Sequence, residues 1–171
     1  MSYLLWLVVT WLLLGLCSPM LGSVNGHFYA PDVLVITALF AAHKGNILPA
    51  IVTVFAAGLL KDGFCLAAPV GVFTESAVLT FLAMRMASPH TDLRSPVTLM
   101  ATAAIASLLN TAMFLLFETV FHRDFGSHAQ ALTMALPLAL MTMLAAPFQF
   151  ALLNRVGGMS KRRSAPDGML H

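Results

Sequence analysis

Apolar runs long enough to cross a membrane constrain this chain more than any other feature. About 20 apolar residues cross the hydrocarbon core of a bilayer, and runs of that length cover residues 3–21, 69–87, 97–121 and 131–153. In addition, 59% of the 171 residues are hydrophobic and only 9% are charged, whereas about a quarter of a soluble domain is charged. The sequence therefore predicts an all-α membrane protein.

Two shorter apolar runs, residues 28–42 and 47–60, lie between the first and second long runs. Only the polar segment 43–46 separates them, so two structures remain open: two short helices, or a re-entrant hairpin. With two helices, the chain forms a compact bundle of about six transmembrane helices in which the second and third are short. Three prolines stand where helices would begin, a position that tolerates proline. They are Pro31, Pro69 and Pro96.

The domain organisation follows from the absence of a polar block large enough to fold separately. Residues 1–155 are predicted to form a single transmembrane domain, and residues 156–171 a basic, flexible cytoplasmic tail. Pro137 and Pro147 lie inside the last apolar run. Neighbouring helices can satisfy the carbonyl groups that such prolines free, so we expect the last helix to be bent.

The distribution of Lys and Arg predicts the orientation, because positive residues near span ends stay in the cytoplasm. With six spans and a cytoplasmic N-terminus, seven of these residues lie inside and two, Lys61 and Arg123, lie outside. The hairpin alternative moves only Lys44 outward. Both termini are therefore predicted to be cytoplasmic. The seven inner residues are Lys44, Arg85, Arg94, Arg155, Lys161, Arg162 and Arg163.

Charged residues within or beside the spans are candidate functional residues. Charge is costly inside a bilayer and normally faces the bundle interior or a water-filled cavity. Glu75 is the clearest case, since it would lie about 9 Å into a helix that begins at Pro69. The candidates for a cavity or a partner surface are Asp62, Glu75, Lys61, Asp32 and Glu118.

Structural alternatives exist for several of these candidates. Asp32 follows a proline that starts a helix, where a carboxylate favours the positive end of the helix dipole. Lys61 could extend its ammonium group to the headgroups, so that Lys61 and Asp62 would be a boundary pair. Asn110, in the middle of the fifth span, suits an interhelical hydrogen bond better than a ligand contact.

Recognised catalytic and metal-binding patterns are absent from the sequence. It contains no phosphate-binding glycine loop, no Gly-x-Ser-x-Gly and no His-Glu-x-x-His, and its six histidines are dispersed. We therefore expect a protein that is not an enzyme, that holds no metal or other cofactor, and that does not bind nucleic acid.

Residues 28–87 contain Pro31-Asp32-Val33-Leu34, two short apolar helices around the turn at 43–46, then Gly58-Leu59-Leu60-Lys61-Asp62 and Pro69-Val70-Gly71. In this order of motifs they resemble the MreD family of rod-shape-determining proteins. In that family a glycine-rich helix ends in an aspartate, to which Asp62 corresponds, and Gly58, Pro69 and Gly71 match the flanking positions. Lys61 and Glu75 depart from the family pattern, so any role for them rests on physical argument.

The resemblance implies a non-enzymatic scaffold of the cell-elongation (rod) complex in the bacterial inner membrane. MreD proteins bind MreC, a bitopic protein, and through it the RodA glycosyltransferase, a penicillin-binding transpeptidase and MreB filaments. The scaffold would support peptidoglycan synthesis and rod shape. The resemblance also predicts that replacing Asp62 by alanine weakens assembly and leaves membrane insertion intact.

Two other functions remain open. MreD-like chains resemble the substrate-binding subunits of energy-coupling-factor transporters, small six-span proteins with an outward-facing pocket. The outer acidic residues would suit a cationic small molecule there, but residues 3–9 lack the Ala-x-x-x-Ala pattern of those subunits. A proton-coupled carrier built on Asp62, Glu75 and Glu118 would need charged residues that continue across the inner half.

Overall fold

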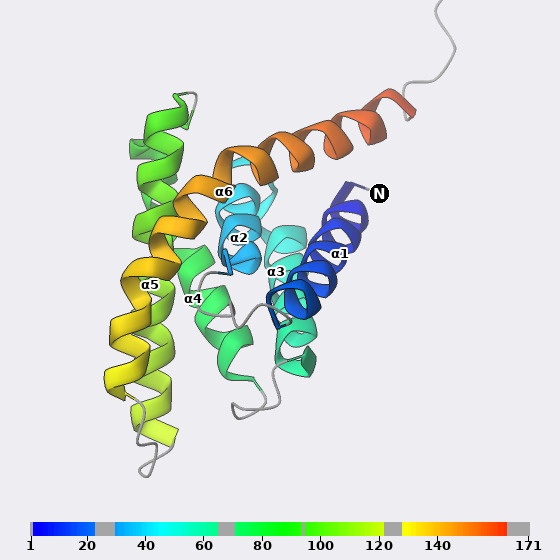
Figure 1. Ribbon diagram of the computed structural model, residues 1–171. Helices are drawn as coiled ribbons and strands as arrows, with labels where there is room; N and C mark the ends of the chain where they lie inside the picture. Colours follow the sequence, from blue (N-terminus) through cyan, green and yellow to red (C-terminus); the bar gives the residue numbers. More distant parts are fainter. Residues whose placement is uncertain (1, 23–29, 65–70, 94, 122–127, 164–171) are drawn as a thin grey trace, which may run out of the picture.

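The computed structural model describes residues 2–22, 30–64, 71–93, 95–121 and 128–163, and all regular secondary structure in these segments is helical. Successive α-helices run in alternate directions, so the first begins at the end of the bundle where the last finishes (Figure 1). The all-helical prediction is confirmed. The elements are α1 (Ser2–Gly22), α2 (Val33–Lys44), α3 (Ile47–Phe64), α4 (Val72–Ala87), the short 3-10 helix η2 (Ser88–His90), α5 (Pro96–Phe121) and α6 (His128–Arg163).

The short helix α2 is the centre of the bundle. It has 12 residues, which makes it about 18 Å long, and it contacts all the other α-helices. Every residue from 33 to 42 is buried. A helix that is apolar all round is stable only when it is enclosed on all sides, and α2 is enclosed by its five neighbours (Figure 1).

Both ends of α2 receive hydrogen-bond partners from the chain. At the start, Asp32 is the N-cap, and its carboxylate accepts the Val35 N–H at 3.5 Å. At the finish, the Gly45 N–H donates to the Ala41 carbonyl at 2.9 Å. The Arg85 guanidinium, from α4, donates to the carbonyls of Ala42 and Gly45. Backbone groups that a helix end leaves unpaired are thus satisfied within the protein.

The contact between α3 and α4 depends on Gly58. A β-carbon at this position would lie 2.6 Å from the Thr74 Cα and 3.1 Å from the Thr74 Oγ1, which is closer than van der Waals contact allows. The absence of a side chain therefore lets the two backbones approach. Small residues serve this purpose widely in membrane helices.

Replacing Gly58 by alanine should separate α3 from α4. We expect a loss of about 1–3 kcal/mol in the free energy of unfolding, the usual cost of overpacking. Gly63→Ala is the matched control on the same helix, because nothing lies within 4 Å of its added carbon. That variant should be neutral or stabilising, since alanine favours helix. Thermal unfolding of both purified variants measures the difference, and equal stability would contradict the close contact.

Two helices are long and apolar enough to cross a membrane by length and composition. Among the described residues these are Pro96–Phe117, with mean hydropathy 1.9, and Leu132–Gly157, with mean hydropathy 1.8. They belong to α5 and α6, which pack side by side in opposite directions (Figure 1). Tyr3–Leu16 of α1 and Val33–Lys44 of α2 are also apolar but shorter.

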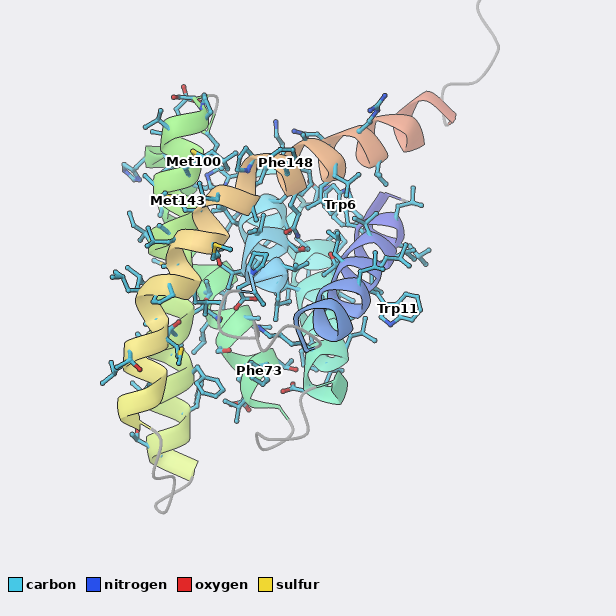
Figure 2. All side chains as sticks on the ribbon, viewed as in Figure 1. Trp6, Trp11, Phe73, Met100, Met143 and Phe148 are labelled. Carbon is cyan, nitrogen blue, oxygen red and sulfur yellow. The ribbon has the colours of Figure 1, made fainter. Side chains whose placement is uncertain are left out.

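The predicted bend in the last helix is present. The first part of α6 runs along α5, and the part that carries Phe148 turns across the bundle, over α2 and towards the start of α1 (Figures 1 and 2). Pro137 and Pro147 lie inside this 36-residue helix. Proline removes a backbone hydrogen bond and kinks a helix. We assign the turn to Pro147, which directly precedes Phe148.

The part of α6 after the turn, residues 148–163, is called the C-terminal arm below. Aromatic rings fix it to the bundle: Phe150 meets Phe40 of α2 edge-on at 4.9 Å, and Phe40 meets Trp6 of α1 in the same way at 4.9 Å. Trp6 also lies against Gly157, where an added β-carbon would be 3.1 Å from the indole Nε1. Figure 2 shows Trp6 between α1 and the arm. The arm is therefore a packed part of the fold.

Two element boundaries differ from the sequence-based expectation. The helix expected from residue 69 begins at Val72, and Pro69 lies outside the described residues. The last helix continues to Arg163, past the expected start of the tail at residue 156, whereas residues 164–171 lie outside the described part. Residues 28–60 form two helices where they are described, joined by the turn at residues 45–46.

Candidate functional site

Asp62 caps the first turn of α4 from the neighbouring helix α3. Its Oδ1 accepts the Phe73 N–H at 3.2 Å, and its Oδ2 accepts the Thr74 N–H at 3.2 Å and also the Thr74 hydroxyl. The residue at the N-cap position, Gly71, has no side chain for this purpose. Asp62 is only 4% exposed. A carboxylate at a helix N-terminus is also favoured by the helix dipole, so Asp62 holds α3 and α4 together.

Lys61, the residue before Asp62, binds a different helix, α2. Its Nζ lies 2.9 Å from Oδ1 and 3.0 Å from Oδ2 of Asp32, at the start of α2. The Asp32 side chain is 4% exposed and the Lys61 side chain 17%. The two neighbouring charges of α3 thus attach it to two different helix starts, α2 through Lys61 and α4 through Asp62.

The interhelical hydrogen bond expected of Asn110 is present and involves the same carboxylate. Asn110, on α5, donates from Nδ2 to Asp32 Oδ2 at 3.4 Å and accepts the Thr80 hydroxyl at 3.3 Å. The Thr142 hydroxyl, on α6, accepts the backbone N–H of Asp32 at 2.9 Å. Asp32 therefore contacts groups from α3, α5 and α6.

Two aromatic rings lie beside these polar groups. The Lys61 ammonium lies 4.9 Å from the centroid of the Phe73 ring, a cation–π distance. Phe73 stacks on Phe114 of α5 with centroids 5.0 Å apart. We call Asp32, Lys61, Asp62, Thr74 and Asn110 the charged cluster. It joins α2, α3, α4 and α5, and its two carboxylates accept donors from the chain itself.

The structure describes the side chain of one of the two remaining charged candidates. Glu75 is exposed in the first turn of α4, because this helix begins at Val72 and the residue is not deep within it. A carboxylate in a first turn is favourable to the helix dipole. Glu118 lies in α5, but its side chain is outside the described part of the structure.

Three motif residues of the MreD resemblance, Pro31, Gly58 and Gly71, lie around the charged cluster. Pro31 directly precedes the N-cap Asp32. Gly71 has φ = 108°, a left-handed conformation that side chains disfavour, and it leads into the turn that Asp62 caps. Gly58 permits the close approach of α3 to α4. Pro69 is outside the described residues.

Sequence reasoning missed a second polar network, beside the start of the C-terminal arm. Gln149 donates from Nε2 to the Val33 carbonyl at 2.8 Å and to the Thr37 hydroxyl at 2.9 Å. Thr37 shares a hydrogen bond with Thr10 of α1 at 2.9 Å. A glutamine in an otherwise apolar run was the available signal, since polar residues often join membrane helices.

An apolar hollow of 430 Å³ lies between α1 and α3. Its walls include Leu4 and Leu7 from one helix and Leu48 and Val52 from the other, and none of the five charged candidates lines it. Among the described residues no group of three or more His, Cys, Asp or Glu side chains could hold a metal ion.

Comparisons with protein-family models, curated proteins and solved structures found no significant match to this chain.

Proposed function

We propose that the chain is a non-enzymatic scaffold subunit of the bacterial cell-elongation complex. In this proposal it forms a six-span bundle in the inner membrane, with both termini in the cytoplasm, and binds the bitopic protein MreC. RodA, a transpeptidase and MreB join indirectly. The MreD-like sequence of residues 28–87 supports the identity of the complex.

The observation that carries the proposal is that the carboxylates of the charged cluster are paired with donors from the bundle itself. Asp32 accepts from Lys61 and Asn110, and Asp62 accepts from the start of α4. A transporter would need such groups to be available to a substrate. Here they connect helices, and many of the side chains that the bundle exposes are large and apolar. Among those exposed side chains are Leu4, Trp11, Leu48, Val97, Leu136 and Phe148.

A bilayer environment explains why a buried helix carries charges at both ends. A length of about 18 Å is too short to cross about 30 Å of hydrocarbon, so the ends of α2 would lie within the membrane. Backbone groups at that depth must be satisfied by protein. At the start of α2, Asp32, which is paired with Lys61, accepts a backbone N–H. At its finish, Arg85 donates to a backbone carbonyl. The charges then support a short central helix inside a membrane bundle.

The alternating helix directions support the proposed topology. The start of α1 and the end of α6 lie at the same end of the bundle (Figure 1), as a protein with an even number of spans requires. Arg85 lies near this end, beside the finish of α2, and Lys61 lies at the opposite end with the start of α2. Both positions agree with the side that the positive-inside rule assigns to each residue.

The test is purification of the tagged full-length chain from its own bacterial host in mild detergent, followed by mass spectrometry. We expect MreC to co-purify, together with a glycosyltransferase and a transpeptidase, and not to co-purify with an unrelated multi-span protein carrying the same tag. Recovery of a transmembrane coupling protein with paired ATPases would contradict the proposal. It would support the alternative, a small-molecule-binding subunit of an energy-coupling-factor transporter.

A further inference from the structure

The C-terminal arm differs from the rest of the bundle in direction. The first part of α6 runs along α5, whereas the arm runs across the bundle at the end where α1 begins (Figure 1). If the bundle spans a membrane, as the proposed function holds, the arm leaves the direction of the first part of α6 and runs obliquely from the level of α2 towards the cytoplasmic end where α1 begins.

One face of the arm packs on the protein and the other is exposed. Gln149, Phe150 and Leu153 are buried, in contact with α2 and the core. Phe148 is 82% exposed and Leu152 40%, and Arg155 is also exposed. These three residues, at spacings of four and three, share a helix face. The exposed face therefore combines two apolar side chains with a basic one.

The charge of the arm is entirely positive. It contains Arg155, Lys161, Arg162 and Arg163 and no acidic residue. A helix with large apolar side chains and basic residues suits the boundary between headgroups and acyl chains, with its apolar face about 5–10 Å deep. Basic residues beside a membrane are attracted to the anionic lipids of the cytoplasmic leaflet.

We propose that the C-terminal arm is an interfacial helix that binds anionic phospholipids of the inner leaflet through Phe148, Leu152 and Arg155. This inference rests on the membrane location in the proposed function but not on the MreC partnership. The arm would fix the depth of the bundle at the surface, while its buried face transmits that position to α2 through Gln149 and to α1 through Trp6 and Gly157.

The experiment measures the depth of single labels in the full-length chain reconstituted in vesicles. Both cysteines are replaced by serine, and an environment-sensitive fluorophore is attached to Leu152→Cys in the arm. The matched position is Leu136→Cys, exposed on the first part of α6. Quenchers are lipids brominated near the headgroup or near the end of the chain, and aqueous iodide.

We expect the label at 152 to be quenched by the shallow bromines and the label at 136 by the deep ones. Strong iodide quenching at 152 with deep quenching at 136 would overturn the interfacial helix but not the membrane location. It would favour a surface that binds a cytoplasmic protein. Deep quenching at 152 would also overturn it, because α6 would then cross the bilayer to that point. Iodide quenching at both positions would contradict the membrane location itself.

The second part of the experiment varies the charge of the lipid. We expect the emission at 152 to shift to shorter wavelength in vesicles that contain phosphatidylglycerol, compared with phosphatidylcholine alone. Arg155→Gln should reduce this shift, as should about 1 M salt, where the Debye length is about 3 Å. Lys44→Gln, which removes an exposed charge elsewhere, should leave the shift unchanged. Equal emission in both lipids would contradict recognition of anionic lipid.

Discussion

Replacing Lys61 by methionine should destabilise the protein by about 3–5 kcal/mol, the usual cost of removing one partner from a buried ion pair. The change keeps an apolar stem and removes the ammonium that lies 2.9 Å from Asp32. The Asp32 carboxylate, 4% exposed, would remain without its counter-ion. At roughly 2–4 °C per kcal/mol for a chain of this size, we expect the melting temperature to fall by about 6–20 °C.

Three further variants distinguish the stability lost with the ion pair from a general effect of mutation. Asp32→Asn keeps an N-capping side chain and should cost less, because the partly exposed Lys61 can turn towards the surface. The double variant D32N/K61M should recover part of the loss, since no charge is left buried. Lys44→Met, at an exposed position, should change stability by less than about 0.5 kcal/mol. Additive losses in the double variant would contradict the pairing.

Replacing Asp62 by alanine should loosen the first turn of α4. The Phe73 and Thr74 N–H groups and the Thr74 hydroxyl would lose their acceptor. A lost cap costs about 0.5–2 kcal/mol, and a buried donor left unpaired costs about 1–3 kcal/mol, so for the cap and one such donor we expect a total of about 1.5–5 kcal/mol. Hydrogen exchange should become faster in the first turn of α4, with α5 unaffected.

Two variants control for the Asp62 prediction. Asp62→Asn retains one acceptor oxygen and should lie between wild type and alanine. Glu75→Ala removes an exposed carboxylate from the first turn of the same helix and should cost no more than about 1 kcal/mol. If Glu75→Ala accelerated exchange as much as Asp62→Ala, the effect would be general electrostatics and not the cap.

The sequence predicted the type and number of helices better than their packing. Apolar runs, prolines and the polar turn at 43–46 indicated each α-helix, and the bend of the last helix followed from its internal prolines. The direction of the arm could not be predicted, because its length and hydropathy alone suit a straight span. Contacts of Trp6 with Gly157 and of Gln149 with α2 hold it across the bundle, and these depend on tertiary packing.

The contacts of the charged residues also depended on tertiary packing, which limited their prediction from sequence. Asn110 was expected to join helices, and it does. The pairing of Asp32 with Lys61 was not predicted, since residues 29 positions apart meet only through the register between α2 and α3. Glu75 was expected deep in a helix, but its depth depended on the first residue of that helix. A shift of three residues in the start, from 69 to 72, placed it in the exposed first turn.

The most direct test of the proposed scaffold function asks whether a folded protein without the ion pair still binds the proposed partner, MreC. The D32N/K61M variant and wild type are expressed at equal levels, their folding is checked by thermal unfolding, and co-purified MreC is quantified by mass spectrometry. We expect equal recovery of MreC, because in the proposed function the charged cluster supports the bundle and does not contact the partner. A variant that folds normally but loses MreC would contradict this account and make the ion pair part of a binding site.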